Sequence, residues 1–124
     1  MNSKVALTLR ILFAISLVVF GLNKFLHFIP TLPLEGTAGE LMNLYVTSGF
    51  MKIIGGLEVI GGISLIVNKF APLSLTFMTA IMFNAVVFHL LHDLAGLGPA
   101  VFGLSIALVN VYFYRSRFTN LLSA

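Results

Sequence analysis

The chain of 124 residues is 59% hydrophobic and only 9% charged, with a mean hydropathy of +1.07. Ordinary soluble domains are about 25% charged, so this composition excludes a soluble globule and indicates one integral membrane domain spanning residues 1–124. The seven basic residues are spread along the chain, which argues against a nucleic-acid partner, and the lack of cysteine removes thiol redox chemistry and iron–sulfur clusters.

Four apolar stretches are long enough to cross about 30 Å of hydrocarbon as helices. They lie at approximately 5–28, 50–67, 72–91 and 99–114. The first resembles a signal peptide, but no small-residue cleavage site precedes Asn23 and further spans follow, so we expect a retained helix. Pro72 and Pro99 stand at the expected starts of the third and fourth spans, where a missing N–H does no harm.

The connections between the spans set the expected fold. Spans two and three, and spans three and four, are joined by short turns, so neighbouring helices should be antiparallel. The connection at 29–49 is longer, and its apolar residues Leu41, Leu44 and Tyr45 have helical spacing. The segment Ala38–Val46 is therefore either a short interfacial helix or a plain loop. The predicted fold class is an all-α, up-down, four-helix membrane bundle.

The basic residues predict how the bundle is oriented. With the N-terminus inside, five of them are cytoplasmic, and only Lys24 and Lys52 are outside. The positive-inside rule then predicts a multi-pass protein of the cell inner membrane with both termini cytoplasmic. The aromatic run Tyr112–Tyr114 beside Arg115 fits an inner interfacial belt.

Glu58 stands out, because it lies within an uncharged apolar run from Ile53 to Ile63. An acid at the centre of a membrane helix costs roughly 2.5–3.5 kcal/mol, so it should have a partner or a task. Gly55, Glu58 and Gly62 share one helix face, and small residues there favour close helix contact. On span one, the seam Arg10, Ala14, Leu17, Gly21 and Lys24 should also face the bundle interior.

The expected topology gathers most polar side chains of the spans into the outer half of the bundle. There they should form an outward-opening polar pocket, the default candidate site in a membrane protein. The candidate residues for ligand binding or a buried polar cluster are Glu58, Lys24, His89, Asn84, Asn23, His27, Lys52 and Arg10. No catalytic residue can be assigned.

Each candidate also has a purely structural interpretation. Glu58 could be an acid that only holds two helices together, and the sequence leaves its charge state open. Arg10 and Lys24 could snorkel to opposite interfaces, and His89 and His92 could simply be interfacial. Asn84 and Asn110 would act as interhelical hydrogen-bonding residues. No compact spacing of ligands indicates a metal or haem site, and His89 is expected to pair with Asp93 four residues on.

The motifs that end and begin the spans resemble the DoxX-like family of small four-helix membrane proteins. They are Gly21-Leu22-Asn23-Lys24-Phe25, Ser48-Gly49-Phe50, Gly56-Leu57-Glu58-Val59-Ile60-Gly61-Gly62, Asn68-Lys69-Phe70-Ala71-Pro72-Leu73 and Phe88-His89-Leu90. The resemblance implies a four-helix bundle and marks Lys24, Glu58, Asn84 and His89 as the family's polar positions. It also implies links to a thiosulfate:quinone oxidoreductase subunit, to redox complexes with soluble partners, and to chaperone or biosynthetic roles.

Two functions are consistent with the sequence. The first is a non-enzymatic accessory, assembly or scaffold module of a membrane complex. The alternative is a redox accessory subunit that binds a quinone or another lipophilic ligand in the outer pocket. No cofactor is recognisable from the sequence, and a quinone or a lipid stays open as a ligand. The expected partners are membrane lipid and a membrane or soluble protein, while enzymatic activity, transport and homo-oligomerisation stay open.

Overall fold

The computed structural model describes residues 3–30 and 33–119, and the described chain is helical with no strand. Its long helices are α1 (Ser3–Leu26), α3 (Phe50–Val67), α4 (Ala71–His92) and α5 (Leu97–Phe113). A shorter helix, α2 (Gly36–Thr47), and two 3₁₀ turns, η1 (Leu94–Gly96) and η2 (Arg115–Arg117), complete the order. Among the described residues, the four long segments, with η1 counted into the last, are long and apolar enough to cross a membrane.

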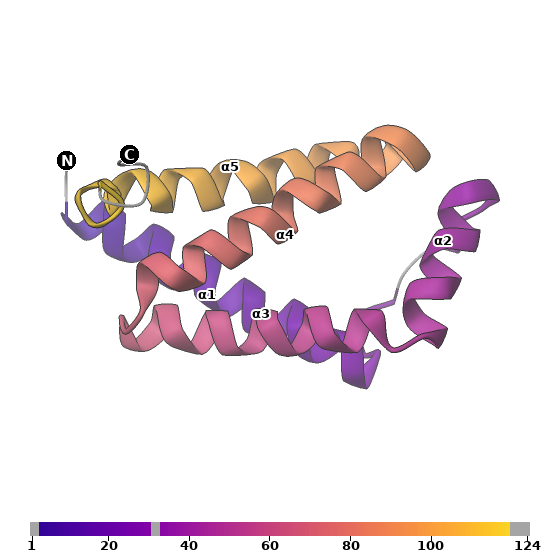
Figure 1. The fold of residues 1–124 in the computed structure, drawn as a ribbon, viewed down its shortest axis with the longest axis horizontal. Coiled ribbons are helices and arrows are strands. Elements are labelled where there is room, and N and C mark those ends of the chain that lie inside the picture. Colours follow the sequence, from indigo (N-terminus) through magenta and orange to yellow (C-terminus); the bar gives the residue numbers. More distant parts are fainter. Residues whose placement is uncertain (1–2, 31–32, 120–124) are drawn as a thin grey trace.

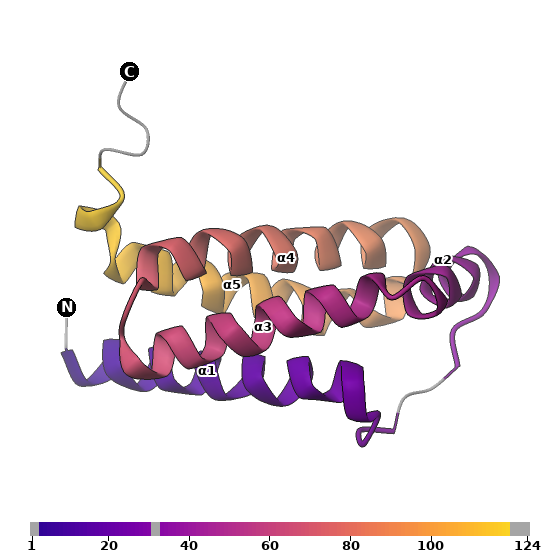
Figure 2. The same ribbon diagram turned by 60° about the horizontal axis from the view of Figure 1, so that its bottom comes forward.

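The long helices form the predicted up-down bundle. Its closest pairings are α1 with α3 and α4 with α5, and the two pairs meet through α3 with α4 and α1 with α5. The described ends of the chain lie together with the α3–α4 turn at one end of the bundle, and α2 lies across the other end (Figure 1; Figure 2). We call the latter the α2 end. A short helix in the long connection is thereby confirmed, and it runs from Gly36 to Thr47.

The second span has its predicted bounds, and the bounds of the other three differ from the prediction by one or two residues for physical reasons. Helix α1 ends at Leu26, because His27 takes a positive φ of 52° and the Ile29 N–H donates to Oδ1 of Asn23 at 2.8 Å. Helix α5 begins at Leu97, so Pro99 lies in its first turn, where its missing N–H leaves no helical hydrogen bond unmade. Similarly, α4 begins at Ala71, directly before Pro72.

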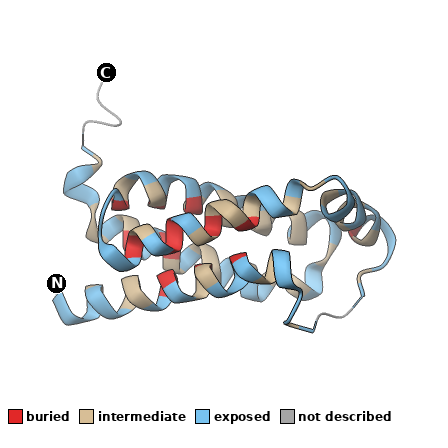
Figure 3. Ribbon diagram, turned by 90° about the horizontal axis from the view of Figure 1, so that it is seen from below, coloured by how far each residue is buried: buried red, intermediate tan, exposed pale blue. Residues whose placement is uncertain are grey.

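Glycines on α3 bring α1 and α3 into backbone contact. A Cβ added at Gly55 would lie 2.8 Å from the Gly21 carbonyl oxygen, and one at Gly62 would lie 2.7 Å from the Ala14 carbonyl oxygen. Both predicted seams are confirmed, since Ala14, Leu17 and Gly21 are buried on α1 and Gly55, Glu58 and Gly62 on α3. The buried residues lie on the faces that the helices turn to each other (Figure 3).

The hydrophobic core lies toward the end opposite α2. Its innermost residues, all at most 1% exposed, include Leu65, Ala71, Leu75, Met78 and Ala107. Figure 1 shows α4 diverging from α3 as it runs from their shared turn toward α2. The close packing of the core thus gives way to open space at the α2 end, where the candidate site lies.

Adjacent glycines offer a matched test of this packing. Gly55→Ala should lower the free energy of unfolding by about 1–3 kcal/mol, because the new methyl group collides with the Gly21 carbonyl oxygen. Gly56→Ala should leave stability unchanged or raise it by up to about 1 kcal/mol, since nothing lies within 4 Å of its Cβ. Denaturant unfolding in bicelles measures both, and equal effects would contradict the α1–α3 packing.

Candidate functional site

An ion pair links the two helices that the glycines bring together. Nζ of Lys24, from the last turn of α1, lies 2.6 Å from Oε1 of Glu58 in the middle of α3. The side chains are 19% and 4% exposed, and Oε1 has this ammonium group as its one polar contact among the described residues. Glu58 therefore has the cationic partner that an acid within a membrane helix needs.

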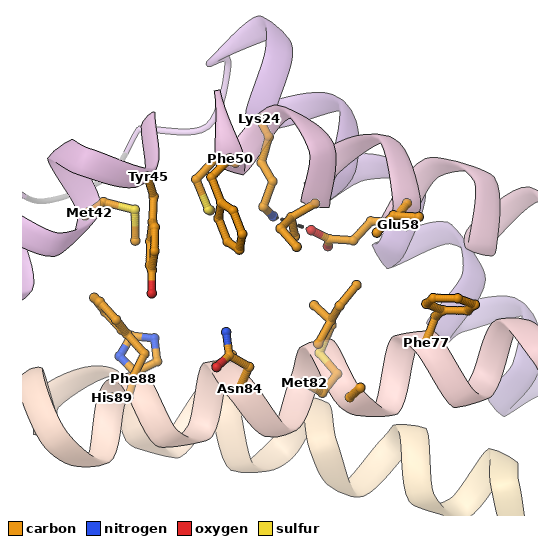
Figure 4. A pocket seen from close by; sticks show the side chains of 16 residues that line it. Lys24, Met42, Tyr45, Phe50, Glu58, Phe77, Met82, Asn84, Phe88 and His89 are labelled. Atoms are coloured by element: carbon orange, nitrogen blue, oxygen red, sulfur yellow. Dashed lines mark ion pairs between the residues drawn. The ribbon is translucent and has the colours of Figure 1, made fainter. Parts of the chain in front are cut away.

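The ion pair lies at the wall of a chamber between α3 and α4 with a volume of about 380 Å³. Figure 4 shows Lys24 and Glu58 on one side of it and Asn84, Phe88 and His89 on the other. Lys24, Glu58, Asn84 and His89 bring polar groups, and the other lining residues are mainly apolar or aromatic. A few polar groups within an apolar chamber are typical of sites for small lipophilic molecules.

Helix α2 covers the open end of this chamber through aromatic and polar contacts. The Tyr45 ring stacks on Phe50 with centroids 5.0 Å apart and lies 6.5 Å from the ring of Phe88. Oγ1 of Thr37 and Nδ1 of His92 are 2.9 Å apart, which ties the start of α2 to the end of α4. Met42 also faces the chamber from α2 (Figure 4).

The predicted pairing of His89 with Asp93 is confirmed. Nδ1 of His89 lies 3.1 Å from Oδ2 of Asp93, four residues further along the chain. A carboxylate at Nδ1 favours a proton on that nitrogen, so a neutral His89 ring presents Nε2 as a hydrogen-bond acceptor. The side-chain amide of Asn84, in the middle of α4, forms no hydrogen bond with any described residue, so it can both donate and accept. The chamber therefore offers donors and acceptors together.

Three of the predicted site residues belong to a second cavity of about 780 Å³, next to the first. Asn23, His27 and Lys52 line this cavity, which lies between the end of α1, the following loop and α2. Lys24 lines both cavities, but Glu58, Asn84 and His89 do not line the second one. The predicted single cluster is thus divided between two neighbouring cavities, which share Lys24, Met42 and Met51 as lining residues.

Arg10 does not join the predicted cluster and lies at the opposite end of the bundle. Its guanidinium donates to the Tyr114 hydroxyl at 3.4 Å, and that hydroxyl donates to Oδ1 of Asn68 in the α3–α4 turn. The Arg117 guanidinium lies 5.4 Å from the centroid of the Tyr114 ring. These contacts tie α1, the turn and the end of α5 together, which is a structural role for Arg10. The periodic seam on α1 predicted the inward face of Arg10 correctly, but Arg10 lies in the first half of the helix, away from Lys24 and the site.

The asparagines do not form the expected interhelical hydrogen bonds. Nδ2 of Asn110 donates to the Ile106 carbonyl oxygen of its own helix at 2.9 Å, and its buried Oδ1 has no partner among the described residues. Asn84 faces the chamber (Figure 4). The sequence did not single out Met42, Tyr45, Phe50 and Phe88 as site residues. The helical spacing of the 38–46 segment was the available signal for α2, yet Leu44, on its predicted apolar face, is 61% exposed.

The donor set of the site suits an organic ligand. Within residues 3–30 and 33–119, no group of three His, Cys, Asp or Glu side chains could hold a metal ion. What the chamber presents is an ammonium group, a carboxylate, an amide and an imidazole beside aromatic rings. Ammonium, amide and imidazole can hydrogen-bond carbonyl or hydroxyl groups, and the rings can pack on a planar head group.

Fold and site together define an integral membrane four-helix bundle with a buried ion pair beside an apolar chamber. The DoxX family model matches residues 5–92, which is more than two thirds of the chain and comprises nearly all of α1 and the whole of α2, α3 and α4. The chain belongs to the DoxX family. Comparison with curated proteins and with solved structures found no match.

Removing one partner of the ion pair tests its contribution to stability. Lys24→Met should lower the free energy of unfolding by up to about 3 kcal/mol, because it leaves the buried Glu58 carboxyl group without a cation. Adding Glu58→Leu to that variant should restore part of the loss, since no unpaired acid then remains.

Denaturant unfolding of both single variants and the double variant gives the coupling energy between the two side chains. If the three variants show strictly additive losses, the side chains do not interact as their 2.6 Å separation requires.

Proposed function

We propose that this protein is a membrane accessory subunit that binds a lipophilic ligand with a carbonyl- or hydroxyl-bearing ring, such as a quinone, in the chamber between α3 and α4. The observation that carries the proposal is the Lys24–Glu58 ion pair at the wall of an apolar, aromatic chamber. An ion pair that served packing alone would not need to border open space. In this proposal the carboxylate of Glu58 holds the Lys24 ammonium in place, and the ammonium recognises the ligand.

Each polar group has a part in ligand binding. The Lys24 ammonium carries three hydrogens, so it can donate to a ligand carbonyl while it contacts Glu58. Nε2 of His89, with Nδ1 directed at Asp93, accepts a hydrogen bond from a ligand hydroxyl. The Asn84 amide can donate to a carbonyl of a quinone or accept from a hydroxyl of the reduced quinol. Phe50, Phe88 and Tyr45 provide the flat apolar surfaces on which a ring packs.

The basic residues support an outer position of the chamber in the membrane. Lys4, Arg10, Lys69, Arg115 and Arg117 lie at or near the end opposite α2, which the positive-inside rule assigns to the cytoplasm. The α2 end, with Lys24 and Lys52, then faces the outer side of the cell inner membrane. A ligand would reach the chamber from the outer half of the bilayer, and electrons for any redox reaction would come from a partner protein.

An assembly or scaffold role is the second candidate. It is favoured by the position of the ion pair directly beside the Gly21–Gly55 contact, where a Lys–Glu pair also specifies how α1 and α3 align. Under this role, Glu58→Gln would weaken capture of a partner complex, and the wild-type protein would bind no quinone.

Equilibrium binding of decyl-benzoquinone to delipidated protein tests the ligand-binding proposal. We expect a one-to-one complex by native mass spectrometry, and for the reduced quinol form of this compound His89→Asn should weaken the affinity about three- to tenfold, through the loss of the hydrogen bond that Nε2 accepts from a ligand hydroxyl. His27→Asn is the matched control, because His27 lies at the same end but lines only the second cavity, and asparagine tolerates its positive φ. Absence of a complex, or equal effects of the two variants, would refute a ligand site in this chamber.

A further inference from the structure

A third cavity runs along the outside of the ion pair, between α1 and α5. Its volume is about 740 Å³, roughly twice that of the chamber between α3 and α4. The two spaces share the lining residues Lys24, Glu58, Met82, Ala85 and His89. The ion pair therefore borders both spaces, one of which lies between α3 and α4 and the other between α1 and α5.

This α1–α5 groove is long, and its lining is mainly apolar. It extends along α1 from Lys24 to Leu9, fifteen residues that correspond to about 22 Å of helix. That length is most of the roughly 30 Å hydrocarbon thickness of a bilayer. Ser16, a polar residue on its wall, donates its hydroxyl to the Phe13 carbonyl oxygen at 2.7 Å and so has its hydrogen bond within α1. The polar groups of the groove are thus concentrated at the end shared with the chamber.

Small residues of α5 leave this groove open. Ala100 and Gly103 lie on its wall with Phe102 and Ile106, and across it α1 presents large apolar side chains that include Phe13 and Phe20. A Cβ at Gly103 would lie 3.3 Å from the sulfur of Met82, a side chain that borders both spaces. Met82 is unbranched and flexible, so it can adapt to a chain that passes between them.

We propose that the α1–α5 groove holds the single long hydrocarbon chain of the ligand whose ring lies in the chamber between α3 and α4. The inference rests on the proposed ligand-binding function and adds the class of ligand, a ring with one linear alkyl or isoprenoid tail. The lining residues that the two spaces share carry it: the polar head is held at Lys24 and His89, and the tail leaves past Glu58 and Met82. Membrane lipids with two chains would place one chain outside the groove.

The test compares two benzoquinones with the same head, one bearing only methyl groups and one bearing a decyl chain. Wild-type protein should bind the decyl compound at least about tenfold more tightly, because the groove buries its methylene groups. Ala100→Phe fills the groove and should remove most of this advantage while leaving the affinity for the methyl compound unchanged. Val101→Phe is the matched control, since Val101 is 45% exposed and lies outside the groove.

The outcomes separate this inference from the proposed function. Equal wild-type affinities for the two compounds, or an equal effect of Ala100→Phe on both, would overturn the tail groove while the head site stands. Binding of neither compound would refute the proposed function and the groove together. Displacement of the decyl compound alone by phosphatidylglycerol would assign the groove to a membrane lipid and overturn the proposal. If Ala100→Phe does not fold, Ser16→Leu on the facing helix makes the same test.

Discussion

The structure depends on one buried electrostatic contact, the ion pair between Lys24 at the end of α1 and Glu58 in the middle of α3. Separating such charges in a low-dielectric interior is expensive, and leaving either one alone costs more than removing both. The contact is possible because glycines let α1 and α3 approach until a Cβ at Gly55 would lie 2.8 Å from the Gly21 carbonyl oxygen. Backbone contact and charge pairing thus hold α1 and α3 together at neighbouring positions along both helices.

Besides joining two helices, the ion pair borders two cavities, one between α3 and α4 and one between α1 and α5. The core packs closely around Leu65, Leu75 and Met78 toward the end opposite α2, while α4 diverges from α3 toward the α2 end (Figure 1). This divergence leaves a chamber that Glu58 and Lys24 border on one side and α2 covers at the end. A charge pair that is shielded from water and still borders a cavity can act on a ligand more strongly than an exposed pair, because the local dielectric is low.

Much of the fold could be predicted from the sequence, and the reasons are local. Hydropathy located the four spans to within a few residues, and the spacing of Gly55, Glu58 and Gly62 identified the inward face of α3 correctly. Division of the polar residues between two cavities could not be predicted, because it depends on where α2 lies and how far α4 diverges. Arg10 illustrates the limit: helical spacing gives the face of a residue, but its Tyr114 partner is set by how α1 and α5 pack.

The most direct test of this account is the distance between Lys24 and Glu58 in a bilayer. Solid-state NMR on protein labelled with ¹⁵N at lysine Nζ and ¹³C at glutamate Cδ measures their dipolar coupling, and the Glu58→Gln variant assigns the signal. The account predicts a strong coupling, as a 2.6 Å separation of Nζ and Oε1 demands, that disappears in the variant. A wild-type spectrum without that coupling would contradict the ion pair and the site built around it.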